Sequence, residues 1–394
     1  MNLNRTALAA ALVVGAMALT ACGSDNNKSG GSGGNGSSAS ASSAAGGASS
    51  GTGTSAPAGP DSAGGPGAPS CVKGSVQAEG STAQKNAIGQ WIKDYQGKCD
   101  GSTFTYNPTG SGSGIKNFTG GQVDFAGSDS ALDAKKGEIA AAQKRCGSAP
   151  LDLPMVVGPI AIAYNVKGLD NLILTPTLVA RMFQGKIKTW DDPAIKAANP
   201  GAKLPSSSIK VIFRSEESGT TQNFEKYLAA AAPSDYKAEP SKSWSGSVGE
   251  GKKGSDGVQQ AIQSTDGAIG YVEWSFAQDG GLQQAKIDNG GGAVALTGAS
   301  AGTAVAAAKV TGTGNDLTLS LDYATKAKGA YPIILVTYEV VCTKYSDAKK
   351  AALIKSFLSY TSSSGGQQSV TTLGYAPLPT SIQEKVIASV GRLS

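Results

Sequence analysis

The chain has 394 residues, of which 16% are charged, and it carries a net charge of +5. This length is typical of two or three domains, and the small, dispersed positive charge does not favour a nucleic-acid partner. The sequence contains no histidine, which excludes Ser-His-Asp and Cys-His catalysis and removes the commonest zinc ligand. Cysteines with metal-ligand spacing are missing as well, so we expect no metal and no other cofactor.

Residues 1–22 have the organisation of an export signal. Arg5 supplies a positive start, and residues 6–18 form an apolar segment too short to span a bilayer comfortably. The segment ends in Leu19-Thr20-Ala21-Cys22, which resembles a bacterial lipobox. The resemblance implies a lipoprotein signal peptide ending at Cys22, whose lipid would hold the exported protein at the outer face of the bacterial cell membrane. The alternative is an ordinary secretory signal with an incidental cysteine.

Residues 23–70 consist almost entirely of Gly, Ser, Ala, Asn, Thr and Pro. Such a segment cannot bury enough apolar surface to offset the entropy of ordering, so we expect a disordered tether. As a random coil it would reach on the order of 40 Å.

If Cys22 is lipidated, four cysteines remain in an oxidising compartment, and three pairings are open. We favour Cys71 with Cys99, because each would lie at the start of one of two neighbouring strands, and then Cys146 with Cys342.

The folded body opens with strand patterns at residues 72–78, 102–107 and 122–129. After the first strand, apolar residues at positions 88, 91, 92 and 95 have the spacing of one helix face. After the second, residues 109–116 form a Gly/Ser-rich loop that ends at a helix start and lacks the Gly-Lys-Ser/Thr of a Walker A loop. The third strand ends at Asp129. This residue either caps the next helix or places a carboxylate where it would repel most anions.

The strand at residues 209–213 leads into the most informative segment, residues 214–224. Apolar residues at positions 224, 227, 228 and 231 predict a helix, with Ser218 and Thr220 at N-cap positions and Gly219 permitting a close backbone approach. The strand therefore places Arg214 beside the free N–H groups and the positive dipole end of a helix, which is typical of an anion site. The alternative is a capped helix beside a surface Arg–Glu pair.

Strands that alternate with helices without an internal repeat predict an α/β fold with largely parallel sheets. Two long apolar strands, residues 155–165 and 331–341, flank the middle of the chain and are expected to cross between two lobes. Loops from both lobes would then meet in a cleft at the carboxyl ends of the strands.

Seven motifs occur in a characteristic order, at residues 80–82, 109–114, 123–129, 184–193, 214–220, 267–273 and 331–333. Together they resemble the phosphate-binding protein of the bacterial phosphate-specific ABC importer, over roughly residues 73–390. The resemblance implies a two-lobed, type II periplasmic-binding-protein fold, each lobe a largely parallel sheet flanked by helices, with the two crossover strands as a hinge. Lobe I would comprise residues 71–160 and 335–394, and lobe II residues 161–334. It also implies a monomer that is not an enzyme and that delivers inorganic phosphate to the permease subunits of an importer.

The resemblance also implies a set of phosphate contacts. Carried over residue by residue, they are Thr82, Ala83 through its backbone N–H, Ser111, Asp129, Arg214, Ser218, Gly219 and Thr220. Asp129 would accept a hydrogen bond from the proton that phosphate keeps near neutral pH and would face sulfate as a bare carboxylate, which disfavours sulfate. Glu216 stands where an acidic partner of the arginine is expected. The chain departs from the family at Ala83-Gln84, where relatives carry Phe-Pro, so an aromatic wall of the site is missing.

Other functions remain open from the residues alone. A surface phosphatase could use one of the Ser or Thr hydroxyls as a nucleophile, although the sequence offers no evident base. A binding protein for sulfate or molybdate would use similar loops, but Asp129 argues against it. A purely adhesive surface protein would not need several anion-ready loops.

Overall fold

The computed structural model describes residues 70–394, which belong to a single compact unit. The expected signal peptide, the lipobox at Cys22 and all of the tether before Ser70 lie outside the described residues. Within residues 70–394, no helix is long and apolar enough to cross a membrane. The same residues contain no group of three or more Cys, His, Asp or Glu side chains that could hold a metal ion.

Helices and strands alternate along most of this part of the chain. Its helices are α1 (Lys85–Gln96), α2 (Ser111–Thr119), α3 (Glu138–Cys146), α4 (Pro176–Phe183), α5 (Pro193–Ala198), α6 (Gly219–Ala231), α7 (Gly254–Ser264), α8 (Trp274–Asp279), α9 (Gly298–Val305), α10 (Ala348–Ser362), α11 (Ser364–Ser369), the 3-10 helix η1 (Thr371–Leu373) and α12 (Thr380–Val390). Its strands are β1 (Gly74–Gly80), β2 (Ser102–Asn107), β3 (Phe125–Ser128), β4 (Pro150–Asn165), β5 (Ile173–Leu174), β6 (Lys210–Arg214), β7 (Glu250–Lys252), β8 (Ala268–Glu273), β9 (Gln283–Gln284), β10 (Lys286–Asp288), β11 (Ala293–Val294), β12 (Lys309–Val310), β13 (Leu319–Ser320) and β14 (Ile334–Cys342).

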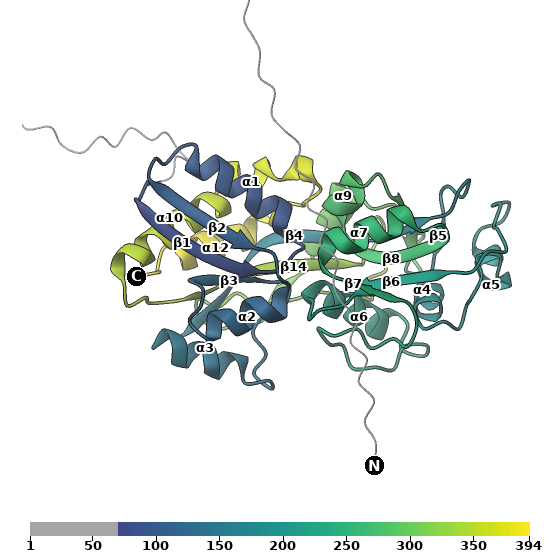
Figure 1. Cartoon of the computed structure of the whole chain (residues 1–394), viewed down its shortest axis with the longest axis horizontal. Coiled ribbons are helices and arrows are strands. Elements are labelled where there is room, and N and C mark those ends of the chain that lie inside the picture. The colour runs from purple at the N-terminus through teal and green to yellow at the C-terminus, as the bar shows by residue number, and fades with distance from the viewer. Residues whose placement is uncertain (1–69) are drawn as a thin grey trace, which may run out of the picture. The chain divides into compact units, whose positions relative to one another are not determined.

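The main sheet has nine strands in the order β2-β1-β3-β14-β4-β8-β6-β7, with β9 paired to β4 (Figure 1). Strand β1 is parallel to β2 and β3, and β6 is parallel to β7 and β8. Strand β14 is antiparallel to β3 and β4, and β4 is antiparallel to β8. The α/β class is therefore confirmed, but the two largely parallel sheets that the sequence predicts are joined into one mixed sheet. The reason is that the two long strands pair with each other and connect the two parallel groups.

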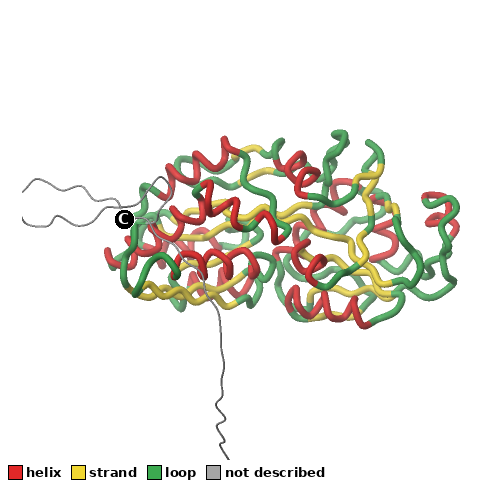
Figure 2. Tube along the Cα trace, turned by 90° about the horizontal axis from the view of Figure 1, so that it is seen from above, coloured by secondary structure: helices red, strands yellow, loops and turns green. Residues whose placement is uncertain are grey.

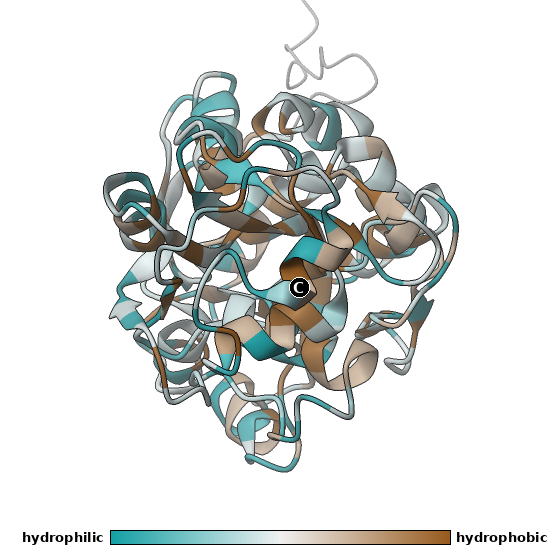
Figure 3. Cartoon of the chain, turned by 90° about the vertical axis from the view of Figure 1, so that its right-hand side faces the viewer, coloured by the Kyte–Doolittle hydropathy of each residue, from teal (hydrophilic) through white to brown (hydrophobic). Residues whose placement is uncertain are grey.

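The described residues form two hydrophobic cores, and both long strands contribute to each of them. Strand β4 places residues between 151 and 157 in the first core and residues 160–164 in the second. Strand β14 does the same, with Val336 in the first core and Leu335 in the second. Helices lie on both sides of the strands (Figure 2), and hydrophilic segments lie chiefly in the outer loops (Figure 3).

Helix α1 confirms the predicted apolar face, because Ile88, Trp91 and Tyr95 are all buried. The Gly/Ser-rich segment differs from the prediction: α2 begins at Ser111, so most of the expected loop is helical. The glycines allow close packing there. A Cβ atom on Gly114 would lie 2.5 Å from the Cα atom of Gly80. Any residue with a side chain in place of Gly114 would therefore push α2 away from the end of β1.

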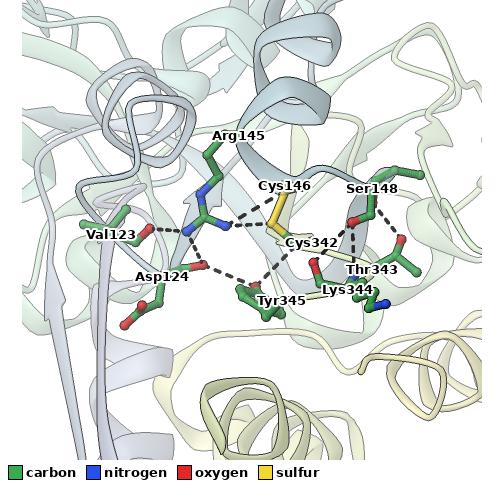
Figure 4. The surroundings of a disulfide bond; sticks show 10 residues. Val123, Asp124, Arg145, Cys146, Ser148, Cys342, Thr343, Lys344 and Tyr345 are labelled. Carbon is green, nitrogen blue, oxygen red and sulfur yellow. Dashed lines mark hydrogen bonds between the residues drawn. A yellow bond between two sulfur atoms is a disulfide. The ribbon is translucent and has the colours of Figure 1, made fainter. Parts of the chain in front are cut away.

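Both predicted disulfides are present. Cys71 and Cys99 lie just before β1 and β2, which start opposite each other with Gly74 facing Ser102. Cys146 ends α3 and is bonded to Cys342 at the end of β14. Figure 4 shows Arg145 beside this second disulfide, where its guanidinium donates to the carbonyl oxygen of Val123 (2.9 Å).

Candidate anion-binding site

The starts of four helices and the ends of two strands meet in one place. A Cβ atom on Gly219, the first residue of α6, would lie 2.6 Å from both Ser111 Oγ and Asp129 Cβ, so α6, α2 and the end of β3 are in close contact. On the other side, the hydroxyls of Thr82 and Ser255 lie 2.9 Å apart and join the turn before α1 to the start of α7. Helix starts offer N–H groups without intrahelical acceptors, together with the positive end of the helix dipole.

Asp129 is the centre of a network of hydroxyl groups. It follows β3 and is 2% exposed. Its Oδ1 atom accepts hydrogen bonds from Ser81 and from Thr337 (2.8 Å), and its Oδ2 atom accepts one from Thr220 (3.0 Å). Its own backbone N–H donates to Ser111 Oγ (3.1 Å). The carboxylate therefore does not cap the following helix, which was one of the two interpretations left open by the sequence.

Two opposing effects set the charge of this carboxyl group. Burial raises the pKa of Asp129, because an ionised carboxylate loses its hydration there. The hydrogen bonds from Ser81, Thr337 and Thr220 and the positive charge of Arg214 lower the pKa. These donors favour the ionised form, which can accept a proton-bearing ligand oxygen.

Arg214, the last residue of β6, is 2% exposed and lies next to this network. Its Nε and Nη2 atoms both donate to Glu216 Oε1, the Nε contact at 3.0 Å, which confirms the expected acidic partner. Its Nη1 atom lies 3.4 Å from the hydroxyl oxygen of Thr220, the residue that donates to Asp129. The same Glu216 oxygen accepts from the backbone N–H of Gly254 at the start of α7 (3.0 Å). The guanidinium is thus fixed between two helix starts.

The start of α6 is organised as the sequence predicts. Ser218 is the N-cap, and its side chain accepts from the backbone N–H of Thr221 (3.2 Å). Gly219 and Thr220 occupy the first turn, where N–H groups have no intrahelical acceptor. Thr220 is therefore not a cap; its hydroxyl belongs to the Asp129 network instead. The hydroxyls of Thr221 and Tyr271 lie 2.6 Å apart and hold the helix against β8.

Polar side chains surround Ala83-Gln84, the two positions at which relatives carry Phe-Pro. The backbone N–H of Ala83, an expected ligand contact, donates to Ser81 Oγ (3.1 Å), and its carbonyl accepts from Tyr375 (2.7 Å). Gln84 is fully buried, and its amide nitrogen donates to Tyr106 (3.0 Å). A glutamine–tyrosine pair therefore lies next to Ala83.

The structure brings the eight predicted residues together in one buried network of contacts. Sequence reasoning missed three members. Ser81 lies within a motif that was identified, and its neighbour was chosen instead. Thr337 is a polar residue inside an otherwise apolar strand pattern, which could have marked it. Ser255 had no local signal beyond its position at a helix start.

Comparisons with known proteins identify the fold and the family of the chain. The family model of the PBP superfamily domain matches residues 42–364, more than half of the chain. Among solved structures, a high affinity periplasmic phosphate-binding protein bound with phosphate aligns with a TM-score of 0.66 at 22% identity, over 80% of this chain and 93% of the other. A phosphate binding protein from Stenotrophomonas maltophilia aligns with a TM-score of 0.60 at 21% identity, over 80% and 93% of the two chains. At these identities the solved structures show the fold alone, and the family model assigns the chain to the PBP superfamily.

Curated relatives narrow this class. The chain is 40% identical over 399 residues to Phosphate-binding protein PstS 3 of Mycobacterium leprae and 41% identical over 399 residues to PstS 3 of Mycobacterium tuberculosis, covering 100% of each chain. It is 31% identical to Phosphate-binding protein PstS of Xylella fastidiosa over 76% of this chain and 80% of the relative. The chain therefore belongs to the PstS family of phosphate-binding proteins, whose members are binding proteins and not enzymes.

Proposed function

We propose that this protein binds inorganic phosphate through Thr82, Ala83, Ser111, Asp129, Arg214, Ser218, Gly219 and Thr220. The observation that carries the proposal is the joining of a buried carboxylate, Asp129, to a buried guanidinium, Arg214, through the Thr220 hydroxyl at a helix start. A site of hydroxyls, N–H groups and one guanidinium suits a small tetrahedral oxyanion. The carboxylate selects an oxyanion that carries a proton.

The chemistry follows from the donors and acceptors. Each charge-assisted hydrogen bond to phosphate contributes roughly 1.5–3 kcal/mol. Asp129 accepts a hydrogen bond from the hydroxyl group that hydrogen phosphate keeps near neutral pH. Sulfate has no such proton near neutral pH, so its oxygens and the carboxylate repel each other.

Phosphate closes a cleft between two lobes, residues 71–160 with 335–394 and residues 161–334, which bend about β4 and β14. Two observations support a division into two lobes: the hydrophobic residues form two cores, and the same two long strands contribute to both. Apolar residues between 301 and 330 pack in the first core, so this segment belongs with lobe I rather than with lobe II. Polar contacts between the cores support the proposal as well. The Lys85–Asp256 ion pair (2.7 Å) connects α1 to α7, and Asn86 donates to Ser275 (3.0 Å).

The liganded protein delivers phosphate to the permease subunits of an ABC importer as a monomer. It is exported and attached by lipid on Cys22 to the outer face of the cell membrane. Family membership supports the transport role, and the two disulfides support an oxidising compartment outside the cytoplasm. Mass spectrometry of the protein from a bacterial membrane tests the anchor; a mature chain that starts elsewhere than at a lipid-modified Cys22 would refute it.

Calorimetric titration with phosphate and with sulfate tests the site. We expect micromolar or tighter phosphate binding, which corresponds to about 8 kcal/mol, and much weaker sulfate binding. Equal affinity for both anions would contradict the role of Asp129.

X-ray scattering tests closure: the radius of gyration of residues 71–394 should fall when phosphate is added, and identical curves would argue against bending of the lobes.

A further inference from the structure

A cavity of about 530 Å³ lies beside the anion site and shares Asp129 with it. None of the other seven proposed phosphate contacts lines it. Its walls come from the segment after β3, from α6 with Lys242, and from residues 311–323 together with Val336 and Tyr338 of β14. The volume falls within the range of small-molecule sites and exceeds what one phosphate ion needs.

The walls of this cavity join the two cores. Ser130, after β3, donates to Gln222 of α6 (2.5 Å). Lys242 forms a 2.8 Å ion pair with Glu138 of α3, and the lysine side chain is 4% exposed. A molecule in the cavity would therefore contact both parts of the protein.

Lys226 is the unusual member of the wall. It lies on α6 and is half-buried, and no ion pair or hydrogen bond of its ammonium group occurs among residues 70–394. Burial lowers the pKa of Lys226, the nearby Lys242 lowers it further, and Asp133 raises it. A partly desolvated cation without a close partner is unfavourable, and an anion bound in the cavity would relieve this cost.

The other polar groups restrict the kind of anion. Within the described residues, the amide nitrogen of Gln222 and the hydroxyl of Ser320 are not engaged in hydrogen bonds, so both can serve a hydroxylated ligand. Asp129 and Asp133 also line the cavity, and their carboxylates would repel a second negative charge. A single negative charge with several hydroxyl groups fits this set.

We propose that this cavity is a second ligand site, which takes small hydroxy carboxylates with the carboxylate at Lys226. Apart from Asp129, the site shares no residue with the proposed phosphate site, and its ligand is of a different class. Its position between the two cores means that an occupant also stabilises their mutual contacts.

Titration calorimetry on the full-length protein, saturated with phosphate so that the first site is filled, tests the proposal. The probes are gluconate, its three-carbon counterpart glycerate, and glucitol, which has the carbon chain of gluconate without the charge. We expect one gluconate per chain, glycerate at the same site, and glucitol binding at least about tenfold weaker because it cannot form the charge-assisted bond. Failure of both acids to bind, or equal binding of gluconate and glucitol, would overturn the proposal.

Variants locate the binding. Lys226→Met should weaken gluconate binding at least about tenfold, and Lys226→Arg should keep most of it. Exchange of an exposed lysine away from the cavity, Lys203→Met, is the matched control and should change nothing. Ala131→Leu, which fills the cavity from its rim, provides a second way to block it if Lys226→Met unfolds. Gluconate affinity unchanged in both Lys226→Met and Ala131→Leu would place the binding elsewhere and reject the assignment.

Discussion

Two buried carboxyl groups differ in their surroundings: Asp129, which follows β3, and Glu339, which lies on the neighbouring strand β14. Asp129 accepts hydrogen bonds from three hydroxyl groups. Glu339, on β14, has a buried Oε2 atom without a hydrogen-bond partner among the described residues. The pKa of Glu339 is raised to about 8, chiefly by burial. The negative charge of Asp129 also raises this pKa, whereas a hydrogen bond with the Gln84 side chain lowers it. Burial raises both pKa values, and at Asp129 more hydrogen-bond donors oppose this rise than at Glu339.

The difference has a functional consequence. An ionised carboxylate only accepts hydrogen bonds and therefore selects a ligand oxygen that carries a proton, whereas a protonated carboxyl can also donate and does not select for that proton. With a pKa of about 8, Glu339 is mostly protonated near neutral pH and adds little negative charge near Asp129. A phosphate ion in the proposed site would therefore meet the carboxylate of Asp129 and the guanidinium of Arg214. The following predictions test this comparison.

Arg214→Ala should give the largest effect. It removes the cation of the site and leaves Glu216 buried without its partner, so phosphate affinity should fall roughly 100-fold or more. Calorimetric titration measures the loss. Arg214→Lys, which keeps the charge but cannot form the same two bonds, should be intermediate, and Lys203→Ala serves as a surface control. An unaltered dissociation constant for Arg214→Ala would rule out its role.

Asp129→Asn should change selectivity more than phosphate affinity. The amide removes the charge that repels sulfate and can donate to a sulfate oxygen, so the ratio of phosphate to sulfate affinity should fall by about tenfold or more. Competition titrations measure the ratio. Glu339→Gln should leave this ratio unchanged, because Glu339 is already neutral at pH 7. If Asp129→Asn discriminates against sulfate as well as the wild-type protein does, Asp129 does not select for the proton of phosphate.

Glu339→Gln should instead act on stability. The pKa of Glu339 is about 8 in the folded protein and 4.5 ordinarily, so between these values the unfolded chain releases a proton that the folded protein keeps. Stability should therefore fall as pH rises through this window, by up to about 1.4 kcal/mol per pH unit. The glutamine variant should lose the contribution of Glu339 to the slope, measured by denaturant unfolding from pH 5 to 8, whereas Asp152, whose pKa is also about 8, keeps its own contribution. Exposed Glu384→Gln is the control, and a variant with the wild-type slope would contradict a neutral Glu339.

The sequence predicted the local parts of this site and missed the distant ones. Arg214, Glu216 and Ser218 lie within five residues, and a strand followed by a capped helix is sufficient to place them. Thr337 is 208 residues from Asp129 and Ser255 is 173 residues from Thr82, so only the pairing of β14 and the packing of α7 bring them into contact. The mixed sheet was not predicted for the same reason, because it depends on contacts between residues far apart in the sequence. Long apolar patterns identified both crossover strands, but their antiparallel pairing is a property of the whole fold.

Thr337→Val gives the smallest predicted effect and the sharpest comparison, because Thr337 and Glu339 lie two residues apart and thus on the same face of β14. Valine keeps the shape but removes the 2.8 Å hydrogen bond to Asp129, so the pKa of Asp129 should rise and phosphate affinity should weaken about fivefold, corresponding to ~1 kcal/mol. The loss should grow as pH falls, since protonation of Asp129 then becomes easier. Thr337→Ser should restore binding. Thr361→Val, which removes another buried hydroxyl away from the site, should leave the affinity unchanged. If Thr337→Val and Thr337→Ser weaken binding equally, packing rather than the hydroxyl is responsible, and the hydrogen bonds to Asp129 do not set its charge.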